Sequence, residues 1–234
     1  MFWFYLFLFI LGLQLGSFIN AFNYRLQTGE SVWRGRSHCP HCQHILSWRD
    51  LIPVLGFLLL KGRCRYCHRP ISKRYPLVEM AAGFLLVIIW VFTASISWAI
   101  FYSIVFLALL AIADYDLQHY LISDKVLLFC LIIALVFLTF TGIQQGNLLN
   151  WPNSPLLLGL LAGALASIFL GLIHCLTRGQ GMGFGDVKLA FILGLIVGWP
   201  DVILALFLSF FIGAIIGLGL VISKKKKMKE ALPF

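Results

Sequence analysis

The sequence predicts an all-α polytopic membrane protein of about seven transmembrane helices, with a small cysteine-rich domain between the first and second spans. Three observations predict this fold. Of the 234 residues, 61% are hydrophobic and only 12% are charged, which leaves too few polar side chains to cover a soluble surface. Apolar runs long enough to cross ~30 Å of hydrocarbon recur along the chain. Four cysteines cluster in one polar segment between such runs.

The first apolar run covers residues 1–22. No Lys or Arg precedes it, and it contains Gln14, Ser17 and Asn20, so we expect a retained span and not a cleaved signal. A shorter run, 187–199, either packs inside the bundle or begins part-way into the membrane at a glycine-rich loop, and counting it gives seven spans. The other spans are predicted at residues 77–92, 96–113, 126–141, 156–176 and 202–222.

The distribution of Lys and Arg orients these spans. With the N-terminus outside, the inner segments are residues 24–76, 114–125, 178–188 and the tail from 223, and together they contain every Lys and Arg in the chain. The only charged side chain on the outer side is Asp201, and acidic residues have little weight in the positive-inside rule. The formal charge of +9 therefore indicates topology and contact with an anionic inner leaflet, and not binding to nucleic acid.

Two C-x-x-C pairs lie in the longest inner segment. The stretches "HCPHC" at 38–42 and "GRCRYCH" at 62–68 supply Cys39, Cys42, Cys64 and Cys67, with 21 residues between the pairs. Each pair offers two thiolates from one turn, so the spacing predicts a single tetrahedral Cys₄ zinc site. Because four thiolates leave no open ligand position, this zinc would be structural and would fold the small domain. Two disulfides or a redox pair are the alternative, which a reducing inner compartment disfavours.

A glycine-rich stretch, "GQGMGFGDVKLAFILGL" at 179–195, places Asp186 at the start of an apolar helix. A glycine followed by Asp is also how an ordinary helix acquires an N-cap, so this motif alone leaves capping and function open. Ionisable side chains at membrane depth are costly and are usually functional. A functional role for Asp186 therefore depends on a partner at the same depth.

The second inner turn, "AIADYDLQHYLISDKVL" at 111–127, offers three partners, Asp114, Asp116 and Asp124. Asp114 and Asp116 are two residues apart, about 200° around a helix, so only one of them can face across the bundle. Paired with Asp186, that carboxylate would share a proton. In such a dyad, the ionised carboxylate takes a proton from the attacking water. The protonated carboxyl donates a hydrogen bond to the scissile carbonyl. Alternatively, these aspartates are ordinary helix-end groups at the interface.

Three blocks of the sequence carry a resemblance to a known family. They are "GSFINAFNYRL" at 16–26, "LIPVLGFLLLKGRCRYCHRPISKRYPLVEMAAG" at 51–83 and "GMGFGDVKLA" at 181–190. The chain resembles the type IV prepilin peptidases, also called leader peptidase and N-methyltransferase, over nearly its whole length. The last block matches the family's G-x-G-D signature, which implies that Asp186 is catalytic. We expect Gly181, Gly183 and Gly185 to hold it in a non-helical turn.

The resemblance also implies which aspartate is the partner of Asp186. In the family, the other catalytic aspartate opens a stretch that ends in proline followed by Asp or Asn. Aligning that end on Ser123 and Asp124 implies that Asp116, and not Asp114, is the second catalytic residue. Ser123 stands where the family has proline, which loosens the alignment at this point.

The resemblance implies a bifunctional enzyme of the bacterial cytoplasmic membrane, with its active site and C-terminus on the cytoplasmic side. It would cleave the leader from type IV prepilins or pseudopilins and methylate the new N-terminus with S-adenosylmethionine. No glycine-rich nucleotide loop follows a strand, so the methyl-donor site would be built from the zinc domain and adjoining span ends. Asn20, Arg25 and Glu79 match family motif positions and are candidate lining residues. Glu79 could equally pair with Lys73 or Arg74 at the interface.

We expect four parts along the chain: a first span (1–23), a cytoplasmic zinc-binding domain (24–76), a multi-span aspartic peptidase domain (77–222) and a basic cytoplasmic tail (223–234). Two other interpretations stay open. One is a non-catalytic, zinc-bearing membrane scaffold for pilus or secretion assembly, in which Asp116 and Asp186 are polar helix-end groups. The other is a G-x-G-D protease for other membrane substrates, against which the zinc domain argues.

Overall fold

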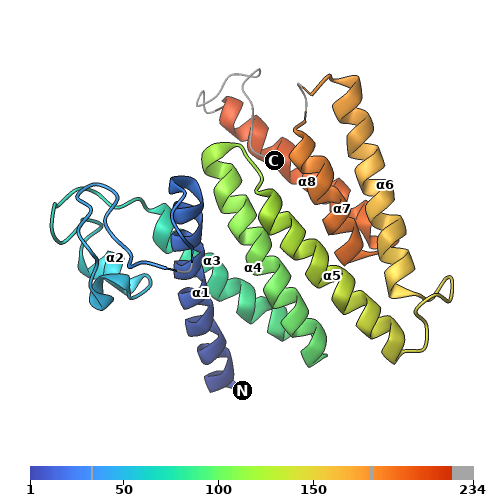
Figure 1. Cartoon of the computed structure of the whole chain (residues 1–234), viewed down its shortest axis with the longest axis horizontal. Helices are drawn as coiled ribbons and strands as arrows, with labels where there is room; N and C mark the ends of the chain where they lie inside the picture. Colours follow the sequence, from blue (N-terminus) through green and yellow to red (C-terminus); the bar gives the residue numbers. More distant parts are fainter. Residues whose placement is uncertain (33, 180–181, 223–234) are drawn as a thin grey trace. The chain divides into compact units, whose positions relative to one another are not determined.

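The structure is a computed structural model that describes residues 1–32, 34–179 and 182–222. Within these ranges the chain is helical and contains no β-strand, as predicted. Gly181 and the expected basic tail lie outside the described residues. The helices are α1 (Phe2–Thr28), η1 (Trp48–Leu51), α2 (Leu55–Leu59), α3 (Arg74–Phe92), α4 (Ile96–His119), α5 (Asp124–Gln144), α6 (Pro155–Leu176), α7 (Phe184–Val197) and α8 (Asp201–Ile222) (Figure 1).

Six of the described helices are long and apolar enough to cross a membrane, namely α1, α3, α4, α5, α6 and α8. The chain is therefore a multi-pass membrane protein. The helix at the expected seventh span, α7, has only 14 residues. At ~1.5 Å per residue it covers ~21 Å, which is short of the ~30 Å of hydrocarbon in a bilayer. The structure thus contains six candidate spans and one shorter apolar helix.

The chain divides into two compact units, residues 1–115 and 116–234. In the first unit α1 packs along α3. A Cβ added to Gly16 would lie 2.6 Å from the Cα atom of Glu79, so this contact requires a residue without a side chain, as close helix pairs in membranes commonly do. Buried Ile19, Val78 and Ala111 join α1, α3 and α4 in one cluster.

In the second unit α6 and α7 pack closely through glycines. A Cβ added to Gly194 would lie 2.6 Å from the Cα atom of Gly163, and one added to Gly163 would lie 2.6 Å from the carbonyl oxygen of Phe191. Small residues on both helices let the backbones approach. This contact fixes the position of α7, whose first turn carries Asp186. A buried apolar cluster of this unit contains Ala162, Ala166, Leu170, Met182, Ala190 and Val202.

Candidate functional site

The four predicted zinc ligands come together in the inner domain of the first unit, which we define as residues 29–73. The sulfur atoms of Cys39, Cys42, Cys64 and Cys67 all lie within 4.8 Å of one another, and those of Cys39 and Cys67 are 3.9 Å apart. A tetrahedral zinc with sulfur at ~2.3 Å separates its ligands by ~3.8 Å. None of these cysteines forms a disulfide. The four thiols therefore fit a zinc ion.

The two cysteine pairs have the same local backbone. In each pair, the residue four positions after the first cysteine has a left-handed φ, 57° at Gln43 and 56° at His68. The N–H group of that residue donates to the carbonyl of the first cysteine, at 2.9 Å in one turn and 3.0 Å in the other. Each C-x-x-C sequence therefore folds into a tight turn that presents both sulfur atoms on one side.

The thiols differ in acidity. Burial raises the pKa of Cys39, but the backbone N–H groups of Cys42 and His41 outweigh burial and lower this pKa to about 7. At Cys67 the backbone N–H of Arg69 lowers the pKa, but burial and the neighbouring thiols raise it to about 11. A bound dication would hold all four thiols in their deprotonated form.

Asp50 joins the second cysteine turn to η1, and sequence reasoning missed it. Its carboxylate accepts hydrogen bonds from Nε of Arg65 at 2.7 Å and from the hydroxyl of Ser47 at 2.8 Å. Burial raises the pKa of Asp50, but these hydrogen bonds outweigh burial and hold the pKa below its ordinary value. Its contribution to stability is therefore lost as the pH falls through the folded-state pKa. The available signal was that Asp50 is the single acidic residue in 31–78.

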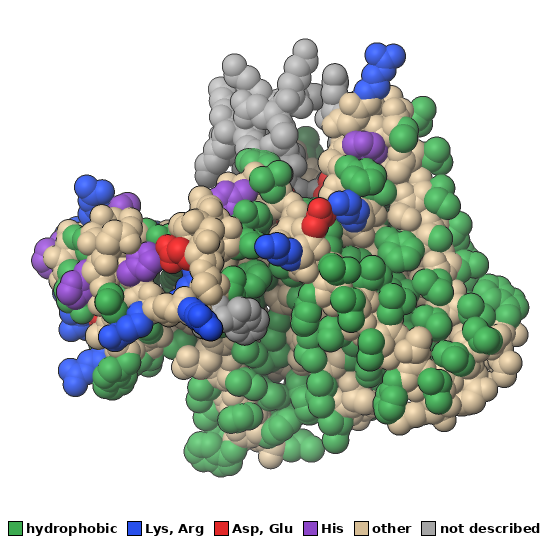
Figure 2. Space-filling view, viewed as in Figure 1, with side chains coloured by type: hydrophobic (Ala, Val, Ile, Leu, Met, Phe, Trp, Pro, Cys, Tyr) green, Lys and Arg blue, Asp and Glu red, His purple; other side chains and the backbone are tan. Residues whose placement is uncertain are grey.

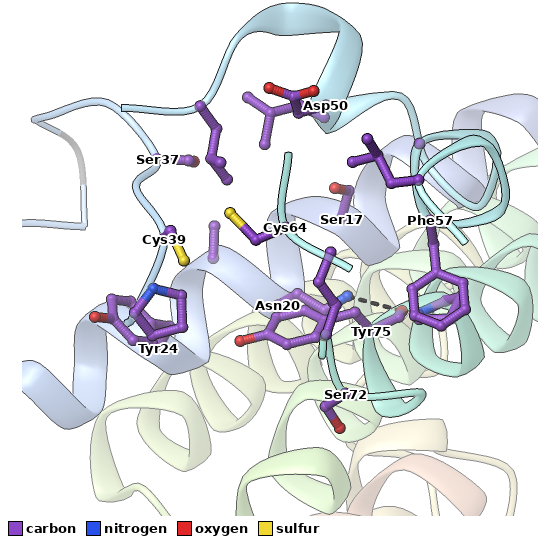
Figure 3. A pocket seen from close by; sticks show the side chains of 18 of the residues that line it. Ser17, Asn20, Tyr24, Ser37, Cys39, Asp50, Phe57, Cys64, Ser72 and Tyr75 are labelled. Atoms are coloured by element: carbon purple, nitrogen blue, oxygen red, sulfur yellow. Dashed lines mark hydrogen bonds between the residues drawn. The ribbon is translucent and has the colours of Figure 1, made fainter. Parts of the chain in front are cut away.

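A cavity of about 490 Å³ lies between the inner domain, α1 and α3, all within the first unit. Figure 3 shows Cys39 and Cys64 among the lining residues, together with Ser17 and Asn20 of α1 and Tyr75 of α3. This volume is typical of small-molecule sites, which combine an apolar wall with a few polar groups. The two cysteine turns therefore form part of a ligand-sized pocket.

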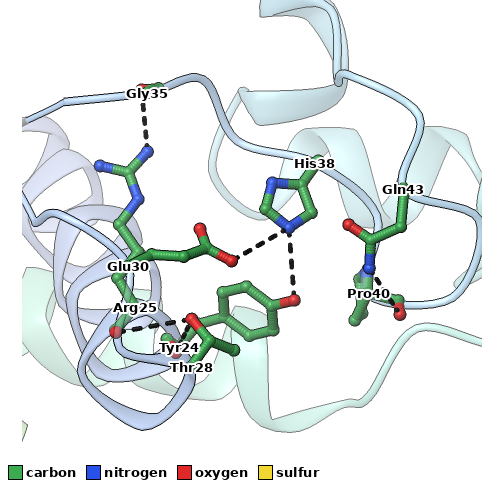
Figure 4. A network of polar contacts seen from close by, with 8 residues as sticks. All are labelled: Tyr24, Arg25, Thr28, Glu30, Gly35, His38, Pro40 and Gln43. Atoms are coloured by element: carbon green, nitrogen blue, oxygen red, sulfur yellow. Dashed lines mark hydrogen bonds and ion pairs between the residues drawn. The ribbon is translucent and has the colours of Figure 1, made fainter.

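Asn20 and Arg25 both line this cavity, but only Asn20 offers it a spare polar atom. Nδ2 of Asn20 donates to the carbonyl of Tyr75 at 3.0 Å, while its Oδ1 is buried without a partner among the described residues. The guanidinium of Arg25 donates to the carbonyl of Val32 at 2.9 Å. It also donates to the carbonyl of Gly35 at 3.0 Å (Figure 4). Arg25 therefore holds the segment that follows α1.

Glu79, the third candidate, also lines the cavity and is only 8% exposed. Its Oε2 accepts the backbone N–H of Val54 at 2.7 Å. Val54 has a φ of 60°, which a β-branched residue rarely adopts. The Glu79 carboxylate thus holds a strained turn at the start of α2. Arg74, an expected partner of Glu79, instead pairs with Asp114, with Nε of Arg74 and Oδ1 of Asp114 3.6 Å apart.

Asp116 and Asp186 lie close together in the second unit. Asp116 is in the last turn of α4 and Asp186 in the first turn of α7; both are half-buried, and the charge of Asp186 acts on Asp116. Oδ2 of Asp186 also accepts the N–H of Gly183 at 3.1 Å, so the same carboxylate caps α7. The expected non-helical turn at Asp186 is wrong, because Gly185 and Asp186 lie within the first turn of α7, and of these two glycines only Gly183 precedes the helix. A Cβ added to Gly185 would lie 3.2 Å from the side chain of Ile122. The turn after α4 therefore packs against the start of α7.

Asp114 faces different partners from those of Asp116. It is 3% exposed in the first unit, and its Oδ2 accepts a hydrogen bond from Nδ2 of Asn23 at 2.6 Å. Its Oδ1 lies 3.6 Å from Nε of Arg74. Asp114 therefore links α4 to α1 and α3. The side chains of Asp114 and Asp116 point in different directions because positions two residues apart on a helix are separated by ~200°.

Two further contacts that sequence reasoning missed support the start of α7. Nζ of Lys188 donates to Oδ1 of Asp124 at 2.8 Å, which links α7 to the first turn of α5. Nδ1 of His174 donates to the carbonyl of Met182 at 2.8 Å, which links the end of α6 to the residues before α7. A lone histidine near the end of an apolar run was the available signal for His174.

Two family models together match most of the chain. The family model described as "Bacterial Peptidase A24 N-terminal domain" matches residues 10–93, and that described as "Type IV leader peptidase family" matches residues 103–218. No solved structure matches the chain significantly.

Several curated relatives carry the name prepilin leader peptidase/N-methyltransferase. The chain is 35% identical to that of Bacillus subtilis (strain 168), over 97% of this chain and 87% of the relative. It is 32% identical to that of Aeromonas hydrophila, over 97% and 84%, and 36% identical to that of Klebsiella pneumoniae, over 82% and 85%. Matched in both halves and along almost its whole length, the chain belongs to the type IV leader peptidase family.

Proposed function

We propose that this chain is a bifunctional membrane enzyme that cleaves the leader of type IV prepilins or pseudopilins and then methylates the new N-terminal amine. Family membership and the shared name of the relatives support both reactions. One observation supports the choice of catalytic residues. The turn that follows Asp116 packs against the start of α7 through Ile122 and Gly185, whereas Asp114 is engaged by Asn23 and Arg74.

The two carboxylates would act as an aspartic dyad. Like charges held close cannot both ionise easily, so the pair shares one proton. The ionised member takes a proton from water as the water attacks the scissile carbonyl, and the protonated member hydrogen-bonds to the carbonyl oxygen. The N–H of Gly183 holds Oδ2 of Asp186, which orients one carboxylate before the substrate arrives.

We place the N-terminus outside and the dyad on the cytoplasmic side of a bacterial inner membrane. Every Lys and Arg then falls on the inner side. The short helix α7 would be the seventh membrane-embedded helix, supported by its glycine contact with α6. A prepilin could then keep its hydrophobic helix in the bilayer and its basic leader in the cytosol, with the cleaved bond at the interface.

The proposed enzyme would bind a metal ion and a methyl donor. A structural zinc would be held by the four clustered thiols, and S-adenosylmethionine would bind in the cavity beside them. The cavity suits the latter because its wall is mostly apolar and includes the unpartnered Oδ1 of Asn20. When bound, S-adenosylmethionine supplies an electrophilic methyl group.

The residues of the chain would prepare the amine. An N-terminal ammonium must lose a proton before its lone pair can act as a nucleophile, and Glu79 is a buried carboxylate in the cavity wall that can accept it. Oδ1 of Asn20 would accept a hydrogen bond from an N–H group and so orient the reacting partner. Arg25 and the zinc-binding turns keep the wall in place.

Glu79→Gln should therefore separate the two reactions. We expect methylation to fall by ~10²–10⁴-fold, the usual contribution of a general base, while leader cleavage stays close to that of the wild type. Incubation of the purified protein with a prepilin and labelled S-adenosylmethionine, followed by mass analysis of the product N-terminus, measures both reactions. Glu30→Gln is the matched control, because Glu30 is an exposed carboxylate of the same compact unit. Wild-type methylation by Glu79→Gln would rule out Glu79 as the base.

A further inference from the structure

The inner domain carries five exposed large apolar side chains on two neighbouring short helices. Helix η1 contributes Trp48 and Leu51, and α2 contributes Leu55, Leu58 and Leu59, with exposed fractions from 39% to 77%. The two helices are in contact, and the three leucines share one face of α2 because of their i, i+3, i+4 spacing. We call these five residues the η1–α2 patch. A contiguous exposed apolar surface of this kind marks an interaction site.

A hydrogen bond fixes the depth of this patch relative to the spans. The N–H of Val54, which precedes α2, donates to Glu79, and Glu79 lies in the second turn of α3, ~8 Å from its first residue. Glu79 packs on Gly16 of α1, which lies two turns, ~10 Å, before Asn23, the first polar residue after the apolar run. Figure 1 accordingly shows α2 beside the middle of α1. The patch therefore begins on the hydrocarbon side of the polar helix ends.

Positive charge borders the patch. Arg49, Lys61 and Arg63 are exposed, and the guanidinium of Arg49 lies 5.4 Å from the ring of Trp48. Residues 31–78 contain nine Lys and Arg but only one acidic residue, Asp50. Figure 2 shows Lys and Arg side chains next to hydrophobic ones on this domain. An apolar face with a basic border is complementary to a bilayer surface with anionic headgroups.

We propose that the η1–α2 patch rests in the inner leaflet of an anionic bilayer and attaches the inner domain to the membrane between the first two spans. Interfacial helices bury their apolar face ~5–10 Å into the headgroup boundary, which is the depth at which Glu79 holds Val54. Val54, Gly56 and Phe57 also line the cavity. Under the proposed function, the patch would bring one wall of the methylation site to the membrane surface, where a membrane-anchored substrate presents its N-terminus.

An environment-sensitive fluorescent amino acid at Leu58 tests this proposal in the full chain, reconstituted in phosphatidylcholine–phosphatidylglycerol nanodiscs. Lipids with brominated acyl chains quench probes in the hydrocarbon, and aqueous iodide quenches probes in water. Reference probes are placed at Phe84, exposed in α3, and at Gln27, exposed in the last turn of α1. We expect the Leu58 probe to resemble the Phe84 probe, with strong quenching by brominated lipid and protection from iodide.

Two results would overturn the proposal. Iodide quenching of the Leu58 probe to the level of the Gln27 probe would place the patch in water, and protection from both quenchers would mean that a protein surface covers it. A second measurement uses the double variant Leu58→Glu, Leu59→Glu with the probe at Leu55. Quenching by brominated lipid should fall while zinc content is unchanged, and undiminished quenching would count against a bilayer contact.

Discussion

Asp116→Asn and Asp186→Asn should each abolish leader cleavage, lowering kcat by ~10³-fold or more, because each change removes either the base or the proton donor of the dyad. Zinc content and thermal stability should stay close to those of the wild type, since both side chains are only half-buried. Cleavage of a prepilin by the purified variants in nanodiscs measures the effect. The loss should appear in the chemical step and not in substrate binding.

Asp114→Asn is the matched control, two residues from Asp116 in the same helix. Asp114 is buried against Asn23 and Arg74, so this variant should lose ~1–3 kcal/mol of stability and still cleave. An inactive Asp114→Asn with an active Asp116→Asn would show that the alignment through Ser123 is wrong by two residues. If the Asp116 and Asp186 variants both cleaved normally, the aspartic mechanism would fail and a non-catalytic scaffold would be the better interpretation.

Cys42→Ser should release the zinc and unfold the inner domain. Structural zinc sites in small domains contribute ~10–16 kcal/mol of apparent binding energy, which is also folding energy. Methylation should be lost with the fold, because Cys39 and Cys64 line the cavity. Cleavage should be much less affected, because Asp116 and Asp186 belong to the other compact unit. Metal analysis measures the loss of zinc. Limited proteolysis of the full-length variant, with cleavage sites mapped within residues 29–73, measures the unfolding of the inner domain.

Two cysteines outside the cluster provide controls for this prediction. Cys130→Ser and Cys175→Ser remove single thiols that are not among the clustered ligands, so both variants should keep about one zinc per chain. Wild-type protein that contains no zinc when freshly purified would contradict the assignment of the site. Full zinc occupancy in Cys42→Ser would contradict the ligand set.

Features encoded by local spacing could be predicted from the sequence. The C-x-x-C pairs need only a tight turn each, and their four sulfur atoms do come together. The long apolar runs become α1, α3, α4, α5, α6 and α8, because a single segment must satisfy its own backbone hydrogen bonds in hydrocarbon. The apolar run at 187–199 is shorter than the others, and the structure accordingly forms a helix of only 14 residues there, α7.

Features that depend on contacts between distant residues could not be predicted in this way. The helical period separates Asp114 from Asp116 but does not say which of them faces Asp186. That distinction rests on Asn23, which contacts Asp114 from 91 positions away. Likewise Glu79 could pair with Lys73 or Arg74 by proximity, but its carboxylate accepts the N–H of Val54 instead. No local pattern signals such contacts, because tertiary packing selects among several allowed partners.

A single turnover of the wild-type enzyme with a prepilin and S-adenosylmethionine, in water enriched in the heavy isotope of oxygen, tests both reactions and the role of the dyad. Mass analysis should find a pilin that has lost its leader and carries an N-terminal methyl group. One heavy oxygen should appear in the new carboxylate of the leader, because the dyad activates water, and none in Asp116 or Asp186. An unprocessed prepilin beside a folded, zinc-containing enzyme would rule out the peptidase activity. Heavy oxygen in either aspartate would show that an aspartate, and not water, attacks the scissile carbonyl.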